Sequence, residues 1–106
     1  MSTMKVTAWA NGAHDCPATA YGFKVKPCDR EKYFDRGWKT VTIVLPTGKE
    51  IQVNVDKKSF WNKCPELINK EIRDWLRETK EAPWDPGCPP TFEMTVQANG
   101  KFTIST

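Results

Sequence analysis

Basic and aromatic side chains alternate between residues 24 and 39. The basic ones are Lys24, Lys26, Arg30, Lys32, Arg36 and Lys39, and the aromatic ones are Tyr33, Phe34 and Trp38. Basic side chains neutralise phosphates, and aromatic faces stack on exposed bases. The pattern therefore favours a surface for RNA or single-stranded DNA, with Lys24, Lys26, Arg30, Lys32, Arg36 and Trp38 as candidate contacts. The alternative is a solvated loop with inward-pointing aromatic side chains, because three acidic residues dilute the positive field.

The chain is rich in tryptophan, with five in 106 residues. Trp75 and Trp61 fit core positions. Trp9 and Trp84 lie near expected loops and are candidates for a surface that binds a protein partner or a second copy of the chain. Trp84 also lies in a segment that loosely matches a proline-rich peptide ligand, but such matches are common by chance, and we favour a core lid.

Cysteine and histidine are the remaining residues with metal or nucleophile chemistry. Structural zinc sites usually take two ligands from one tight turn, but no pair of cysteines has C-x-x-C spacing. His14 and Cys16 share a loop, where a base and a thiol cannot easily align. We therefore expect free thiols in or near the core, with no catalytic residue, metal or cofactor. Whether His14 and Cys16 line a pocket stays open.

Two pairs of period-2 segments predict the elements that position these residues. Alternating apolar residues over 40–45 and 50–55 flank a Pro/Gly turn, and those over 92–97 and 102–104 flank Asn99-Gly100. Such pairs are typical of β-hairpins. Residues 4–9 and 21–25 fit two further strands. Short helical turns are expected after Asp29 and after Asp56, each capped by the aspartate.

One main amphipathic helix is expected from Pro65 to about Thr79. Ile68, Ile72 and Trp75 share one face, and Pro65 suits a first helical position. The elements together predict an α+β fold. A curved antiparallel sheet or open barrel of five to six strands would pack against this helix.

Size and composition predict a single cytoplasmic domain over residues 1–106. The chain is 39% hydrophobic and 27% charged, with a net charge of +3 concentrated in its N-terminal third. No apolar run approaches the roughly 20 residues that span a bilayer, and the N-terminus has no apolar signal core. We therefore expect reduced cysteines and no membrane partner.

Several short motifs resemble a small uncharacterised bacterial family of the kind carried on mobile elements and integron gene cassettes. They are Ala20-Tyr21-Gly22-Phe23-Lys24-Val25, Asp29-Arg30, Tyr33-Phe34, Trp38, Asn54-Val55-Asp56-Lys57, Ser59-Phe60-Trp61, Glu66-Leu67-Ile68, Trp75-Leu76, Ala82-Pro83-Trp84, Pro89-Pro90 and Phe92. The resemblance covers the chain from about Trp9 to Phe102. It implies a compact stand-alone domain and brings no activity, cofactor or catalytic residue.

The sequence thus favours a non-enzymatic binding protein whose ligand is nucleic acid. A protein-interaction or self-associating module is the first alternative. The second is a small-molecule binder or enzyme with a pocket between sheet and helix.

Overall fold

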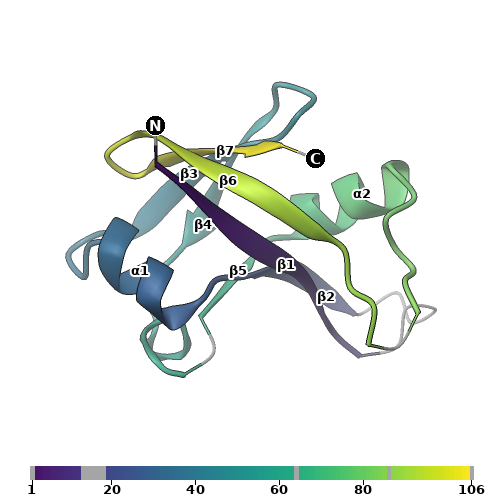
Figure 1. Cartoon of the computed structure of the whole chain (residues 1–106), viewed down its shortest axis with the longest axis horizontal. Helices are drawn as coiled ribbons and strands as arrows, with labels where there is room; N and C mark the ends of the chain where they lie inside the picture. The colour runs from purple at the N-terminus through teal and green to yellow at the C-terminus, as the bar shows by residue number, and fades with distance from the viewer. Residues whose placement is uncertain (1, 13–18, 64, 86, 106) are drawn as a thin grey trace.

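Seven β-strands form one mixed sheet in the described part of the chain (Figure 1). The structure is a computed structural model, which describes residues 2–12, 19–63, 65–85 and 87–105. The strands are β1 Thr3–Asn11, β2 Ala20–Lys24, β3 Thr40–Val44, β4 Glu50–Asn54, β5 Glu66–Ile68, β6 Thr91–Ala98 and β7 Lys101–Ser105. Their order across the sheet is β4-β3-β7-β6-β1-β2-β5.

Both predicted hairpins are confirmed. β3 pairs antiparallel with β4, and β6 pairs antiparallel with β7. Gly48 and Gly100 turn the two hairpins with φ angles of +90° and +75°, a left-handed region that glycine adopts without steric cost. The α+β class is confirmed as well.

The strand count and the pairing directions need correction. The described sheet has seven strands rather than five or six, and it is mixed because β3 and β7 run parallel. Short turns reveal only strands that are neighbours in sequence. The parallel pair joins strands from distant parts of the chain, so hairpin signals could not predict it. The sheet does not close, although its two edges are linked where the Asn69 side chain donates to the Gln52 carbonyl at 2.8 Å.

The main helix begins later than predicted. α2 spans Lys70–Glu78, and the preceding Glu66–Ile68 forms β5, which pairs with β2. Leu67 is buried opposite Phe23 in this pair, so sheet pairing overrides the helical pattern. The Asn69 side chain accepts from the Glu71 N–H and caps α2 in place of Pro65.

Two shorter helical segments complete the fold. α1 spans Pro27–Tyr33 and the 3₁₀ turn η1 spans Lys58–Trp61. The predicted aspartate caps are wrong, because neither segment has a side-chain cap and α1 instead begins at Pro27. Proline suits a first helical position, where its missing N–H costs nothing.

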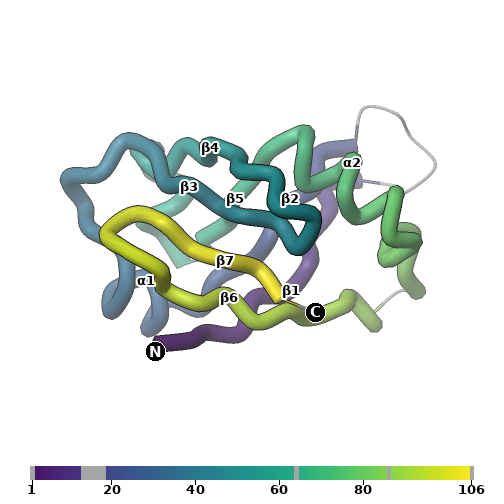
Figure 2. Tube along the Cα trace, turned by 90° about the horizontal axis from the view of Figure 1, so that it is seen from above, coloured from purple at the N-terminus to yellow at the C-terminus, as the bar shows by residue number. Residues whose placement is uncertain are grey.

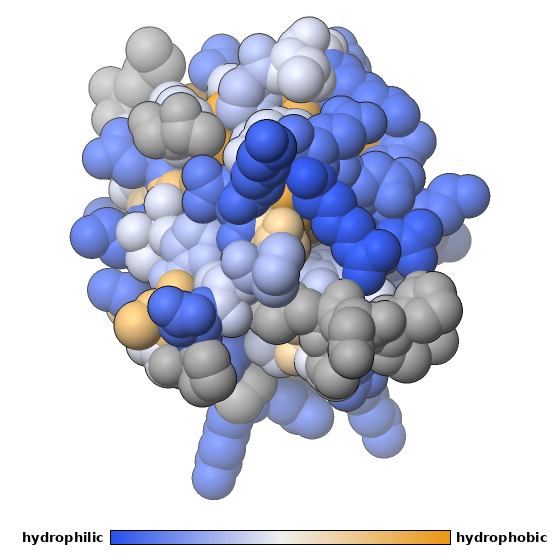
Figure 3. All heavy atoms as spheres, turned by 90° about the vertical axis from the view of Figure 1, so that its right-hand side faces the viewer, coloured by the Kyte–Doolittle hydropathy of each residue, from blue (hydrophilic) through white to orange (hydrophobic). Residues whose placement is uncertain are grey.

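The coiled sheet encloses one apolar core. α2 contributes Ile72, Trp75 and Leu76, and α1 and α2 lie at opposite ends of the molecule (Figures 1 and 2). Aromatic rings pack against one another in this core. The ring of Phe34 stacks on that of Phe102 with 4.8 Å between the ring centroids, and the rings of Trp75 and Phe92 have centroids 5.2 Å apart. Neither helix in the described residues is long and apolar enough to cross a membrane. The end that carries α2 shows mainly hydrophilic side chains, interrupted by small apolar patches (Figure 3).

Gly22 allows β2 and β5 to approach closely. A Cβ atom at this position would lie 2.3 Å from the Leu67 carbonyl oxygen, which belongs to the paired backbone. We expect Gly22→Ala to lower the free energy of unfolding by about 1–3 kcal/mol, because the strands must move apart. Denaturant titration measures this loss.

Gly37→Ala is the matched control for that substitution. A Cβ added at Gly37 would lie nearest to a carboxylate oxygen of Asp35. The Asp35 side chain is exposed and can move aside. Equal losses of stability in the two variants would contradict the close-approach explanation.

Candidate nucleic-acid interface

A hollow on the surface lies between α1, η1 and β5. It has a volume of about 830 Å³. Its lining residues are Pro27, Arg30, Ser59, Trp61, Asn62, Lys63 and Glu66. We refer to it as the Arg30 hollow. Because its residues come from two segments that are distant in sequence, 27–30 and 59–66, the fold must assemble it.

Arg30 fixes the geometry of this hollow from inside the protein. Its side chain is only 8% exposed, and it donates to the carbonyl oxygens of Phe60, at 3.1 Å, and Asn62. Its Nε is buried and has no hydrogen-bond partner in the described residues. Arg30 therefore joins α1 to the segment after η1, and it is a positioning residue rather than an exposed phosphate contact.

Trp61 forms a wall of the hollow in a fixed orientation. Its indole N–H donates to the Val55 carbonyl at 3.0 Å, and its ring lies edge-on to Phe60. The guanidinium of Arg36 lies 4.5 Å from the ring centroid, within cation–π range. Glu31 bonds the same guanidinium at 3.2 Å. The indole packs against the core, as predicted, but it is only half-buried, so part of its surface lies beside cationic groups.

Two further hollows share lining residues with the Arg30 hollow, and a third shares residues with one of these two. One lies between Lys24, Lys26 and Lys63, and it shares Lys63 with the Arg30 hollow. From it, Lys24 leads to a third hollow, which is lined by Trp9 and Trp84 among others. In the other direction, Trp61 also lines a hollow with Arg36, Asp56, Lys57 and Lys58.

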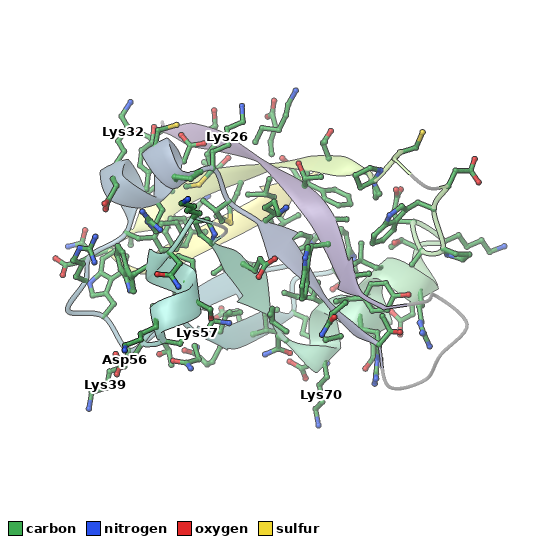
Figure 4. The ribbon with its side chains drawn as sticks, turned by 90° about the horizontal axis from the view of Figure 1, so that it is seen from below. Lys26, Lys32, Lys39, Asp56, Lys57 and Lys70 are labelled. Carbon is green, nitrogen blue, oxygen red and sulfur yellow. The ribbon has the colours of Figure 1, made fainter. Side chains whose placement is uncertain are left out.

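These hollows are linked by shared lining residues, and we call the surface that they define the basic strip. Its residues with charged or aromatic side chains are Trp9, Trp84, Lys24, Lys26, Lys63, Arg30, Glu66, Trp61, Arg36, Asp56, Lys57 and Lys58. Figure 4 looks onto this side, with Lys26 and Lys32 projecting from the region of α1 and Lys57 at the start of η1. Lys39 lies beside Asp56, and Lys70 points away from the strip at the lower border of the view.

The lysines of the strip keep their charges available to a ligand. Within the described ranges, none of the five has a carboxylate oxygen within 4.0 Å. Lys24 lies opposite Glu66 in the β2–β5 register without forming such a pair. A strip with unpaired ammonium groups and aromatic rings at both ends has the composition that single-strand binding requires.

The surroundings of Lys57 change its pKa. Partial burial lowers the pKa of Lys57 below its usual 10.5, and attraction to the Glu66 carboxylate partly offsets this effect.

The structure places three of the six predicted nucleic-acid contacts on the strip as exposed side chains, namely Lys24, Lys26 and Arg36, whereas the buried Arg30 lines it as a positioning residue. Lys32 instead lies over the Tyr33 ring at 5.3 Å. Trp38 is half-buried, edge-on to Phe34, and packs against the core. The predicted interaction residues Trp9 and Trp84 lie at one end of the strip.

Sequence reasoning missed the contribution of residues 57–63. Lys57, Lys58, Trp61 and Lys63 repeat the basic and aromatic alternation of residues 24–39, and that signal could have identified them. Only the fold brings the two segments together.

The other predicted sites receive less support. Cys28 and Cys88 are exposed, which corrects their placement in or near the core. His14, Cys16 and Cys64 lie outside the described residues. No group of three potential metal ligands occurs in the part of the chain that the structure describes. A hollow between the sheet and α2 has about 200 Å³, which is smaller than the roughly 300–1,000 Å³ typical of small-molecule sites.

Comparison of the chain with protein-family models, curated proteins and solved structures finds no match. The resemblance to mobile-element and integron-cassette proteins therefore stays a prediction.

Arg30 should be essential for stability. Arg30→Met keeps much of the side-chain volume but removes the donors to Phe60 and Asn62. We expect a loss of about 2–3 kcal/mol in the free energy of unfolding, because buried carbonyls lose charged donors. Arg36→Met, an exposed control, should cost under about 1 kcal/mol. Similar losses in both variants would show that Arg30 does not hold η1.

Lys57 should make stability depend on pH in the alkaline range. Its folded-state pKa is lowered, so the unfolded chain binds more protons between that pKa and about 10.5. The stability of the wild type relative to Lys57→Met should therefore rise with pH across this window and stay constant below it. Denaturant titrations at successive pH values measure the difference. A difference that falls with pH would mean that attraction to Glu66 outweighs burial.

Proposed function

We propose that the protein binds single-stranded nucleic acid along the basic strip. The observation that carries this proposal is that four hollows are linked through the shared lining residues Lys24, Lys63 and Trp61. A flexible polyanion can follow such a surface while its phosphates meet the lysines.

The shape of the strip favours a single strand over a duplex. In a duplex the base faces are stacked inside, so tryptophan rings cannot reach them. An unpaired base can stack on an aromatic ring, which contributes roughly 1–3 kcal/mol per base. Trp61 lies toward one end of the strip, and Trp9 and Trp84 line the other.

The residues predicted for a protein-interaction surface lie on the same strip. Trp9 and Trp84 line their hollow together with Lys24. An aromatic surface beside unpaired lysines matches a ligand that carries both bases and phosphates. It matches an apolar patch on a protein partner less well.

Removing individual lysines from the strip should weaken binding in a salt-dependent way. Fluorescence anisotropy of a labelled oligothymidylate, titrated at several salt concentrations, gives the slope of log affinity against log salt. Each of Lys24→Ala, Lys26→Ala and Lys63→Ala should make the slope shallower by about 0.7, because one phosphate contact is lost from a single strand. Competition with an unlabelled duplex should show the preference for the single strand.

Lys70→Ala is the matched control, because Lys70 is exposed on α2 and points away from the strip (Figure 4). It should leave the slope unchanged. No binding at low salt would overturn the proposed function, and an equal effect of Lys70→Ala would overturn the assignment of the site.

A further inference from the structure

Glu66 is an unexpected residue on a surface that binds phosphates. It lines the Arg30 hollow and is half-buried. In the described part of the chain its carboxylate has no hydrogen bond and no ion pair within 4.0 Å. A negative charge here would weaken binding if the hollow received only phosphates. A carboxylate becomes favourable where the ligand presents hydrogen-bond donors.

The position of Glu66 is set by strand pairing rather than by a flexible loop. β5 pairs with β2 so that Leu67 is buried against the core, while Glu66 and its cross-strand neighbour Lys24 lie on the outer face. Trp61, held by its bond to Val55, lines the same hollow. The hollow thus combines a carboxylate whose backbone is set by strand pairing with an aromatic ring that already lies beside the exposed Arg36 guanidinium, and Lys63 at its border can meet a phosphate.

Among the common bases, guanine best matches this arrangement. Its Watson–Crick edge presents two adjacent donors, N1–H and N2–H₂, which a carboxylate can accept as a pair. Adenine and cytosine each place a ring acceptor beside their amino group, and thymine or uracil flanks its single N–H with two carbonyls. An unpaired base exposes this edge to the protein while its face stacks on an aromatic ring.

We infer that the Arg30 hollow is a guanine-binding subsite, in which Glu66 accepts from the base edge and the indole of Trp61 contacts its face. The inference rests on the proposed single-strand function and adds a base preference to it. The adjoining lysines hold the phosphates on either side of the guanine.

The test compares oligothymidylates that carry guanine, adenine, cytosine or thymine at one central position, by anisotropy at fixed salt. The guanine oligonucleotide should bind about tenfold more tightly than the others, as expected for one bidentate base contact. Glu66→Gln should reduce this preference to near unity. Glu93→Gln, which removes the same charge from an exposed position on β6, should keep it.

The outcomes separate this inference from the proposed function. Salt-dependent binding of all four oligonucleotides with equal affinity would overturn the guanine subsite and leave the basic strip intact. Binding of none would overturn the proposed function itself. If Glu66→Gln strengthens binding of every oligonucleotide equally and keeps the preference, Glu66 is only a repulsive charge and the inference fails. The wild-type comparison decides the question even if a variant does not fold.

Discussion

The buried guanidinium of Arg30 is the interaction on which the candidate interface depends. It reaches from α1 to the carbonyls of Phe60 and Asn62, thirty and more residues away in the chain. An arginine shielded from water is costly unless its donors are used. Here two backbone carbonyls and Glu31 use them, while Nε has no partner in the described residues. This contact fixes the position of η1 relative to α1, and with it the ring of Trp61.

The sheet provides the second constraint. β5 has only three residues, yet its pairing with β2 decides which side chains face outward beside the hollow. That pairing requires a residue without a Cβ at Gly22. This edge of the sheet and the turn before it set the positions of Lys24, Glu66 and Lys63. A change in the spacing of the two strands would therefore displace these charges along the strip.

The sequence predicted the features that depend on local pattern. Alternation around Pro46–Lys49 and Asn99-Gly100 was enough to predict both hairpins, because turn chemistry and period-2 burial act over short distances. It could not predict the parallel β3–β7 pair. The strand at Glu66–Ile68 also escaped prediction, because Ile68 fits the helical spacing of Ile72 and Trp75.

The candidate site was predictable to a similar degree. The basic and aromatic stretch pointed to Lys24, Lys26 and Arg36 correctly as surface groups on the strip, but it treated Arg30 as one more exposed cation. Burial of an arginine depends on carbonyls supplied by a distant turn, which composition does not reveal. Lys63 and Trp61 were also missed, because only the tertiary fold brings their segment beside α1.

The most direct test of the account follows the five tryptophan indole N–H signals by NMR as a short oligothymidylate is added to ¹⁵N-labelled protein. The account predicts that Trp61 and the pair Trp9 and Trp84 shift, together with the amides of Lys24 and Lys63, while the core residue Trp75 does not. Shifts confined to Trp38 and α2, or no shifts at low salt, would contradict a single strand lying along the basic strip.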